Sequence, residues 1–387
     1  MKNFNYQAGT KILFGKNKIN ELADEILPFG KRVLITYGKG SVVKSGLLDA
    51  VKSELKEKDI YIEELGGIQP NPRLASVREG IAICREKKIE FVLAIGGGSI
   101  IDGSKAIAAG VNYPGDVWDF YIRKAVPETA LPLGTILTLA ATGSEMNGSS
   151  VITNDETQEK LPTSSECLRP KISVLDPTLT FTVNKWQTAS GVVDIMSHIF
   201  EQYFTPDLGT DLQDNMAEGI LKTCLKYGPI AIKEPKNYEA RANLMWASSI
   251  ALNGLMVTGK MSGDWGTHMI EHEVSAIYDL THGAGLSILF PNWMKFVLNE
   301  RNAFKFARLG KNVFGIEESE AMLAATKTIE AIRAFFTSLD MPASLSDVDI
   351  PSEHFKVMGE KACQFGPIGY FKRLNGEDVT AILKMSK

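Results

Sequence analysis

The chain has 387 residues, a length that predicts two domains, because a single hydrophobic core rarely serves more than about 250–300 residues. Hydrophobic residues make up 44% of the sequence and charged residues 23%, a balance typical of soluble globular proteins. The formal net charge of -4 argues against a nucleic-acid partner, since phosphate binding requires a basic face.

The sequence carries no signal for export or for a membrane. No apolar run is long enough to span a bilayer, and the opening residues contain no apolar stretch of the secretory type. The four cysteines, Cys84, Cys167, Cys224 and Cys363, lie far apart and form no CxxC pair. We therefore expect a cytoplasmic protein with reduced thiols, no membrane partner and no zinc-thiolate site.

In chain order, the first half alternates strand-like and helix-like segments. Leu47, Val51 and Leu55 stand at helical spacing after the first strand-like run, and a second amphipathic helix begins at Leu74. The apolar runs predict strands over residues 31–37, 59–65, 90–95 and 131–139. Repeated βα units of this kind predict a parallel sheet with helices on both faces, whose ligands bind beyond the carboxyl ends of the strands.

Strand signals fade in the second half of the chain. Residues 186–204, 240–256 and 266–280 all carry apolar residues at helical periodicity. We therefore predict an α/β domain over residues 1–183 and an all-helical domain over residues 184–387.

A glycine run marks the turn after the most apolar predicted strand. Gly96, Gly97, Gly98 and Ser99 would let backbone N–H groups approach a pyrophosphate closely, beside the positive end of the next helix. The run is not the GxGxxG fingerprint, so a tight βα turn without a ligand remains an alternative. Polar turns after two other predicted strands should reach the same sheet edge, which favours nucleotide binding.

The first of these polar turns reads Gly38-Lys39-Gly40-Ser41 and contains no acid. NAD-binding sites usually place an acid near this point, where it holds the ribose 2′-hydroxyl. Its absence favours NADP(H), with NAD(H) as the alternative cofactor. A turn that simply faces solvent is the third interpretation.

The sequence has only five histidines, and three of them fall within fifteen residues. Asp194 and His198 share a helix face at a spacing of four, as do His268 and His272, while His282 follows a short turn. Two helices and a loop could therefore aim Asp194, His198, His268 and His282 at one point. Imidazole and carboxylate together suit Fe²⁺ or Zn²⁺. Any single histidine is more often a hydrogen-bonded residue of the core than a metal ligand. The paired spacing of these histidines, however, favours a metal site.

Long, ordered motifs now allow the chain to be compared with a known family. They are IQPNP (68–72), GGGSIIDGSKAIA (96–108), LTLAATGSEMN (137–147), DIMSHIFEQY (194–203) and HMIEHEVSAIYDLTHGAGL (268–286). With them the chain resembles the group III iron-containing alcohol dehydrogenases, in the branch of NADPH-dependent aldehyde reductases and butanol dehydrogenases. The resemblance covers nearly the whole chain. It implies an N-terminal Rossmann-like α/β domain, an all-α C-terminal domain and a metal in the cleft between them, an architecture shared with dehydroquinate synthase.

The same resemblance implies site residues. It assigns the metal to Asp194, His198, His268 and His282, and it places His272 near the nicotinamide and substrate, where it would relay a proton. Asp102 is a further candidate catalytic residue. Together with the glycine turns, the resemblance places cofactor contacts at Gly38, Gly40, Ser41, Asn71, Gly96, Gly97, Gly98, Ser99, Asp102, Thr138, Thr142, Ser144, Asn147, Lys160, Thr178, Leu179 and Thr182.

We therefore predict an oxidoreductase that interconverts primary alcohols and aldehydes by metal-assisted hydride transfer with NADP(H) or NAD(H). Aldehyde reduction on short to medium aliphatic substrates is the expected direction, and the resemblance implies a homodimer. Trp118, Asn147, Met261 and Trp265 are candidates for the pocket wall, although single apolar residues are more often ordinary core.

Three alternatives remain open. A polyol dehydrogenase of the glycerol type belongs to the same reaction class. A lyase of the dehydroquinate synthase type is less favoured, because those enzymes use a glutamate where Asp194 stands and need a basic cluster for a phosphorylated sugar acid. A non-catalytic nucleotide-binding protein is the third alternative. It is less favoured, because such a protein would not need the metal ligands that this sequence retains.

Overall fold

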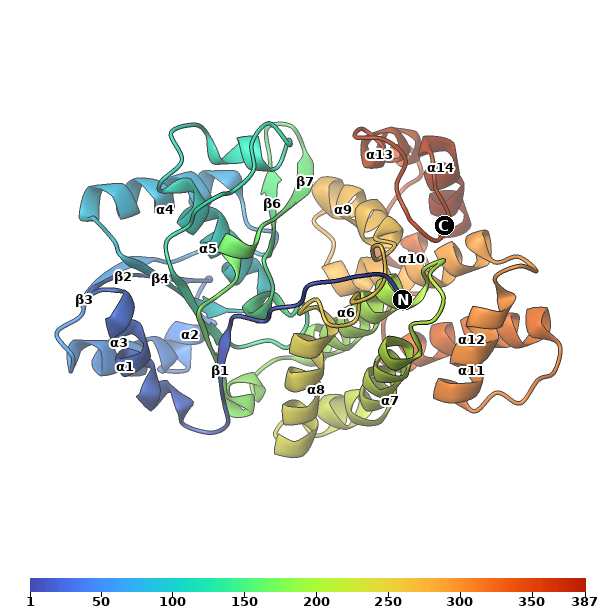
Figure 1. Ribbon diagram of the computed structural model, residues 1–387, viewed down its shortest axis with the longest axis horizontal. Coiled ribbons are helices and arrows are strands. Elements are labelled where there is room, and N and C mark those ends of the chain that lie inside the picture. The colour runs from blue at the N-terminus through green and yellow to red at the C-terminus, as the bar shows by residue number, and fades with distance from the viewer. The chain divides into compact units, whose positions relative to one another are not determined.

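The computed structural model describes residues 1–387 and divides into two compact units (Figure 1). An α/β unit comprises Gln7–Thr182, and a helical unit comprises Met1–Tyr6 and Val183–Lys387. The first six residues group with the helices although their sequence shows neither helical nor strand periodicity. Backbone pairing ties them there, since Lys2 N donates to Gly259 O at 2.7 Å. No helix combines the length and the apolar character needed to cross a bilayer.

The α/β unit is built on a six-stranded parallel sheet with the order β1-β8-β5-β4-β2-β3. Its strands are β1 (Lys11–Phe14), β2 (Arg32–Tyr37), β3 (Tyr61–Leu65), β4 (Phe91–Gly96), β5 (Leu133–Leu137) and β8 (Ile172–Leu175). The predicted parallel sheet is confirmed. No signal in the sequence indicated β1, at the edge of the sheet, or β8 beside it, each of which has only four residues.

Helices cover both faces of this sheet, which explains why every residue of β4 is buried (Figure 1). On one face, Phe91, Leu93 and Ile95 join the core formed with α1 (Leu22–Ile26) and α3 (Leu47–Lys56). The other face is covered by α4 (Leu74–Lys87) and α5 (Gly98–Gly110). A short helix, α2 (Ser41–Lys44), follows β2. A continuous apolar run thus reflects burial on two sides.

The strand order reverses between β2 and β4. β3 lies outside β2, whereas β5 and β8 continue the sheet on the far side of β4. Connections that leave in opposite directions open a crevice at the carboxyl ends of the two adjacent strands, the usual ligand position in such sheets. The turns after β2 and β4 stand at this point.

An antiparallel hairpin of β6 (Ser149–Asn154) and β7 (Glu159–Ser164) lies beside α5, and the sequence did not predict it. Its buried positions mix polar residues with the apolar Ile152 and Leu161, so the hairpin shows no clear apolar alternation. Ser150 is fully buried, and its hydroxyl donates to the Asp102 carbonyl at 2.8 Å and pairs with the Tyr121 hydroxyl at 2.7 Å. Hydrogen bonds thus replace the apolar pattern by which strands are found in a sequence.

The helical unit packs its helices around α6. Its members are α6 (Lys185–Tyr203), α7 (Asp211–Lys233), α8 (Tyr238–Ala251), α9 (Gly266–Tyr278), α10 (His282–Val297), α11 (Ala303–Phe314), α12 (Ala321–Ser338), α13 (Phe355–Ala362) and α14 (Gly376–Met385). Residues 188–203 of α6 are buried all round by α7, α8 and α10. The all-helical prediction is confirmed. The helix expected over 240–256 ends earlier, at Ala251, before Gly254 with φ 93°.

Candidate metal centre and nucleotide edge

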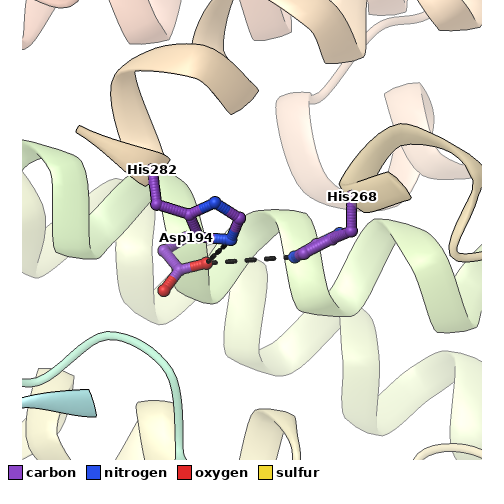
Figure 2. Close-up of side chains that lie close together, drawn as sticks. All are labelled: Asp194, His268 and His282. Carbon is purple, nitrogen blue, oxygen red and sulfur yellow. Dashed lines mark ion pairs between the residues drawn. The ribbon is translucent and has the colours of Figure 1, made fainter. Parts of the chain in front are cut away.

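The side chains proposed as metal donors from the sequence lie around Asp194, and Figure 2 shows two of them, His268 and His282, facing its carboxylate. Oδ1 of Asp194 lies 3.7 Å from Nδ1 of His198. The same oxygen lies 4.0 Å from Nε2 of His268 and 3.7 Å from Nε2 of His282. Nitrogen donors at the usual bond length of about 2.1 Å around a tetrahedral cation stand about 3.4 Å apart. Donor atoms of Asp194, His268 and His282 all lie within 4.8 Å of one another, so a small contraction would bring these three to coordination distances, and His198 adjoins the group through Asp194.

The chemistry of the donors fits a divalent cation. Nδ1 of His198 is buried and has no hydrogen-bond partner, an arrangement that costs free energy unless another group satisfies the nitrogen. Burial, followed by the imidazoles of His268 and His282, holds the pKa of His198 well below its ordinary value. His198 is therefore neutral and offers a lone pair beside the Asp194 carboxylate.

Two buried glutamates orient the imidazoles of the later histidines. Oε1 of Glu201 lies 2.8 Å from Nδ1 of His268 and also accepts the backbone N–H of that residue at 3.0 Å. Oε2 of Glu271 hydrogen-bonds to Nδ1 of His282. A proton shared with the carboxylate on Nδ1 leaves the lone pair on Nε2, which in both rings faces Asp194.

The sequence analysis did not identify these glutamates. Each stands three residues after a predicted ligand, Glu201 after His198 and Glu271 after His268, so each shares a helix face with the metal donors. An acid at this spacing is also common on solvated helix surfaces, which conceals its role. Burial raises the pKa of Glu201 to about 8. Only the structure shows that the carboxyl groups of Glu201 and Glu271 are buried.

Three helices place the ligands. α6 carries Asp194 and His198 one turn apart, α9 carries His268, and α10 begins at His282. The expectation that His282 lies in a loop is wrong, because the glycines after it serve helix packing. A Cβ at Gly283 would lie 2.1 Å from the Ser190 carbonyl oxygen of α6.

His272 lies beside this cluster. It is buried, and its ring centroid is 5.8 Å from that of His282. Donor atoms of Glu271, His272 and His282 all lie within 4.8 Å of one another. The structure thus brings His272 near the ligands, at a distance suited to a proton-carrying group.

In the α/β unit, the predicted glycine turn sits at the carboxyl end of β4. A Cβ at Gly98 would lie 2.4 Å from Oγ1 of Thr142, so a side chain has no room there. Thr138 N donates to Gly96 O at 3.0 Å, which joins this turn to the one after β5. Since β8, β5, β4 and β2 are consecutive neighbours, the predicted turns at 38–41, 96–99, 138–147 and 178–182 lie along one sheet edge.

A buried hydrogen-bond network fixes the turn after β5. Nζ of Lys105, on α5, donates to Oγ of Ser144 at 2.8 Å and to Oδ1 of Asn147 at 3.0 Å. Ser144 in turn donates to Oδ1 of Asp102 at 2.5 Å. Nδ2 of Asn147 donates to Gly143 O at 2.9 Å. Polar groups of this turn therefore hold one another, with the Lys105 ammonium at their centre.

Asp102 and Lys160 complete this region. Burial raises the pKa of Asp102, while the positive charges of Lys105 and Lys160 act in the opposite sense. Lys160 is buried on β7. The hairpin that the sequence missed therefore carries one of the predicted cofactor residues to Asp102.

The remaining predicted residues are more peripheral. Asn71 lies between β3 and α4 with φ 51°. Thr178 and Leu179 lie in a 3₁₀ turn after β8, where Oδ1 of Asp176 accepts the Thr178 hydroxyl at 2.7 Å. Thr182 is exposed. Of the first turn, Gly38 and Gly40 are partly exposed.

The chain matches two family models across most of its length. Residues 9–177 match the iron-containing alcohol dehydrogenase model, and residues 188–387 match the C-terminal model of the Fe-containing alcohol dehydrogenase family. Each match coincides closely with one of the two units described above.

Individual relatives are similar from end to end. NADH-dependent butanol dehydrogenase A of Clostridium acetobutylicum is 50% identical over 100% of both chains. The NADPH-dependent aldehyde reductase of Escherichia coli is 42% identical over 95% of this chain and 94% of its own. The crystal structure of NADH-dependent butanol dehydrogenase A from Thermotoga maritima superposes with a TM-score of 0.97 at 42% identity, covering 100% of this chain and 99% of that one.

Proposed function

The chain belongs to the family of iron-containing alcohol dehydrogenases, metal- and NAD(P)-dependent enzymes, and we propose that Asp194, His198, His268 and His282 hold its metal ion. The observation that supports this assignment is the approach of three imidazole nitrogens to a single oxygen of Asp194. Iron is the expected metal. Zinc is the alternative, because N/O donor sites bind Zn²⁺ more tightly than Fe²⁺.

The dinucleotide is proposed to bind at the carboxyl edge of the parallel sheet. Backbone N–H groups at Gly96–Ser99 would hold the pyrophosphate at the start of α5, with Asp102, Ser144 and Lys160 nearby. NADP(H) is the preferred form, because the turn after β2 has no acid for a ribose 2′-hydroxyl and exposes Lys39.

Lys39→Asp tests the cofactor preference. The ratio of kcat/KM for NADPH to that for NADH should fall at least about 10-fold, because a carboxylate repels a 2′-phosphate and accepts a 2′-hydroxyl. Lys44→Asp, a nearby exposed lysine, serves as the control. An equal ratio in the wild type and in Lys39→Asp would remove Lys39 from cofactor choice.

When bound, the cation polarises the oxygen of an aldehyde or alcohol and the nicotinamide donates or accepts a hydride. The protein's part is positioning and proton transfer. Glu201 and Glu271 keep the Nε2 atoms of His268 and His282 aimed at the Asp194 oxygen. The His272 imidazole is proposed to give a proton to the substrate oxygen during aldehyde reduction and to take it back during oxidation. Imidazole can both donate and accept a proton, which suits both directions.

His272→Ala separates this role from metal binding. The variant should retain the metal, show a lower kcat and have an altered pH–rate profile, because His272 is not one of the four proposed ligands. Turnover with an unchanged pH–rate profile would exclude His272 as the proton relay.

Short to medium aliphatic aldehydes are the proposed substrates, and reduction is the proposed direction. The similar chains from Clostridium and Escherichia carry the names of a butanol dehydrogenase and an aldehyde reductase, which supports this class. A homodimer is further proposed and is checked by sedimentation equilibrium. The four free cysteines support a reducing, cytoplasmic location.

The decisive experiment is a kinetic panel on metal-free enzyme before and after addition of Fe²⁺ or Zn²⁺. Propanal, butanal, hexanal and glyceraldehyde are offered with NADPH and with NADH. We expect metal-dependent consumption of one NADPH per alcohol formed, with the aliphatic aldehydes preferred. Nucleotide binding without turnover after metal loading would instead indicate a binding protein, and a preference for glyceraldehyde would indicate a polyol dehydrogenase.

A further inference from the structure

A tryptophan with an unusual backbone conformation stands three residues before His268. Trp265 has φ 61° and ψ 5°, in the left-handed region that bulky residues rarely adopt. Such conformations persist only where neighbouring groups fix them, and they cluster at functional sites. Trp265 is directly followed by α9, the helix that carries His268 and His272.

The surrounding groups hold this conformation from several sides. Asp264 N donates to the Glu201 carbonyl oxygen at 2.7 Å, and Oδ1 of Asp264 accepts Gly266 N at 3.0 Å. The backbone N–H groups of Trp265, Thr267 and His268 all stabilise the Glu201 carboxylate. The glutamate that orients the His268 ring therefore also fixes the backbone at Trp265.

The second carboxylate oxygen of Asp264 anchors a distant segment. Oδ2 accepts the backbone N–H groups of Tyr370 and Phe371 at 2.7 and 2.6 Å. The backbone on the N-terminal side of Trp265 is thereby tied to two separate parts of the helical unit, α6 and the segment before α14. These contacts hold the backbone of Trp265 in its left-handed conformation.

The indole lies directly beside two proposed ligands. Its ring centroid is 5.5 Å from that of His268, in an edge-on orientation, and 6.4 Å from that of His198. Gly263 makes room for it, because a Cβ there would lie 2.7 Å from the indole Nε1. Trp265 is partly exposed, in contrast to the fully buried Trp293. A partly exposed apolar surface thus adjoins the imidazoles.

We propose that Trp265 is a specificity-determining residue, whose indole forms an apolar wall for the carbon chain of the aldehyde. The inference rests on the metal site proposed above. An apolar wall stabilises a chain of methylene groups by excluding water. It disfavours a hydroxyl at the neighbouring carbons, because the ring face offers no hydrogen bond to replace those lost from water. Trp265 thereby selects aliphatic aldehydes over polyhydroxy aldehydes.

Two substitutions test the wall. Trp265→Gly removes the ring and suits the left-handed backbone, and Trp265→Phe keeps a smaller aromatic ring. In Trp265→Gly, kcat/KM for hexanal should fall at least 10-fold, while the value for acetaldehyde changes less than 3-fold. The ratio of kcat/KM for glyceraldehyde to that for hexanal should rise at least 10-fold. Trp265→Phe should shift the same ratio in the same direction by at least 3-fold. Trp246→Ala, which alters an exposed tryptophan on α8, is the matched control.

A spectroscopic readout accompanies the kinetics. Paramagnetic Co²⁺ added to metal-free protein should quench the fluorescence of Trp265 through its closeness to the ligands, and this quenched component should be missing in Trp265→Phe. The Co²⁺ dissociation constant of Trp265→Phe should stay within 3-fold of the wild type, because the ring is not a ligand.

The possible outcomes separate the inference from the proposed function. If wild-type protein neither binds Co²⁺ nor reduces any aldehyde, the proposed function fails together with the wall. If the wild type binds Co²⁺ and reduces aldehydes but the substrate ratios of both variants equal those of the wild type, only the proposal for Trp265 is overturned. Loss of metal from Trp265→Phe would also overturn it, since the ring would then support the ligands and not the substrate. If Trp265→Gly does not fold, the ratio measured on Trp265→Phe decides.

Discussion

The proposed metal centre of the helical unit and the proposed nucleotide edge of the α/β unit are built from different parts of their residues. The metal centre consists of side chains, with Asp194 facing three imidazoles and two glutamates behind them. The nucleotide edge consists of backbone at Gly96–Gly98, where a side chain has no room. Metal binding should therefore be lost when side chains of the metal centre are removed. Nucleotide binding should be lost when a side chain is added to the glycine turn.

The largest effect is expected for Asp194→Ala, which deletes the one anionic donor of the metal centre. Metal affinity and turnover should fall by more than the 10–100-fold typical of groups that only support a ligand. Equilibrium dialysis with Zn²⁺ and aldehyde reduction measure the two losses, while NADPH binding should be unchanged.

Asp49→Ala is the control for this substitution, since Asp49 is exposed on α3. A metal-loaded, active Asp194→Ala protein would contradict the ligand assignment.

Gly98→Ala tests whether an added side chain weakens nucleotide binding at the nucleotide edge. The new Cβ would lie 2.4 Å from Oγ1 of Thr142, so the turn must open and its N–H groups lose their alignment. The dissociation constant of NADPH, measured by fluorescence titration, should rise about 100-fold, or about 2.7 kcal/mol. Metal content should not change.

Gly219→Ala on α7 is the matched control, because nothing lies within 4 Å of its Cβ position. That change should raise the free energy of unfolding by about 0.5–1 kcal/mol. Wild-type affinity for NADPH in Gly98→Ala would show that the turn does not contact the cofactor.

Glu201→Gln and Glu271→Gln measure how much the supporting carboxylates contribute to the metal centre. Each should weaken Zn²⁺ binding by about 10–100-fold, because the neutral amide no longer stabilises the Nδ1 proton of its histidine. Competition with a chelating dye reports the dissociation constants. Glu79→Gln, on the exposed side of α4, should leave them unchanged. Equal Zn²⁺ affinities in all three variants would mean that the two glutamates contribute to packing and not to metal binding.

An effect on stability, and not on ligand binding, is expected at the buried lysine of the nucleotide edge. Burial lowers the pKa of Lys105 from its ordinary 10.5 to about 8. Between pH 8 and 10.5 the unfolded chain therefore holds a proton that the folded chain has released, so the free energy of unfolding rises with pH. Relative to Lys105→Met, the wild type should gain up to about 3 kcal/mol across this window and nothing below pH 8.

Urea unfolding at pH 7.5, 9 and 10.5 measures this difference, with Lys44→Met as a control at an exposed lysine. Parallel pH profiles for the wild type and Lys105→Met would show that Lys105 keeps its proton in the folded chain.

Regular patterns made much of the fold predictable. The runs at 31–37 and 90–95 appear as β2 and β4, because burial on two sides leaves few polar residues in a strand. The hairpin of β6 and β7 was missed because buried serine and threonine hydroxyls take the place of apolar residues. His282 was placed in a loop because glycines usually mark turns, whereas Gly283 here lets α10 approach α6.

The order of residues specifies which donor types exist and which of them share a helix face, since a spacing of four residues places Asp194 beside His198 whatever surrounds the helix. That α6, α9 and α10 meet follows from the folded packing, because it depends on contacts between residues far apart in the chain. The same packing decided that Glu201 and Glu271 are buried partners of the ligands, and that Trp265 is held in a left-handed backbone. Sequence spacing therefore specifies the geometry within one helix, whereas the convergence of donors from three helices depends on how those helices pack.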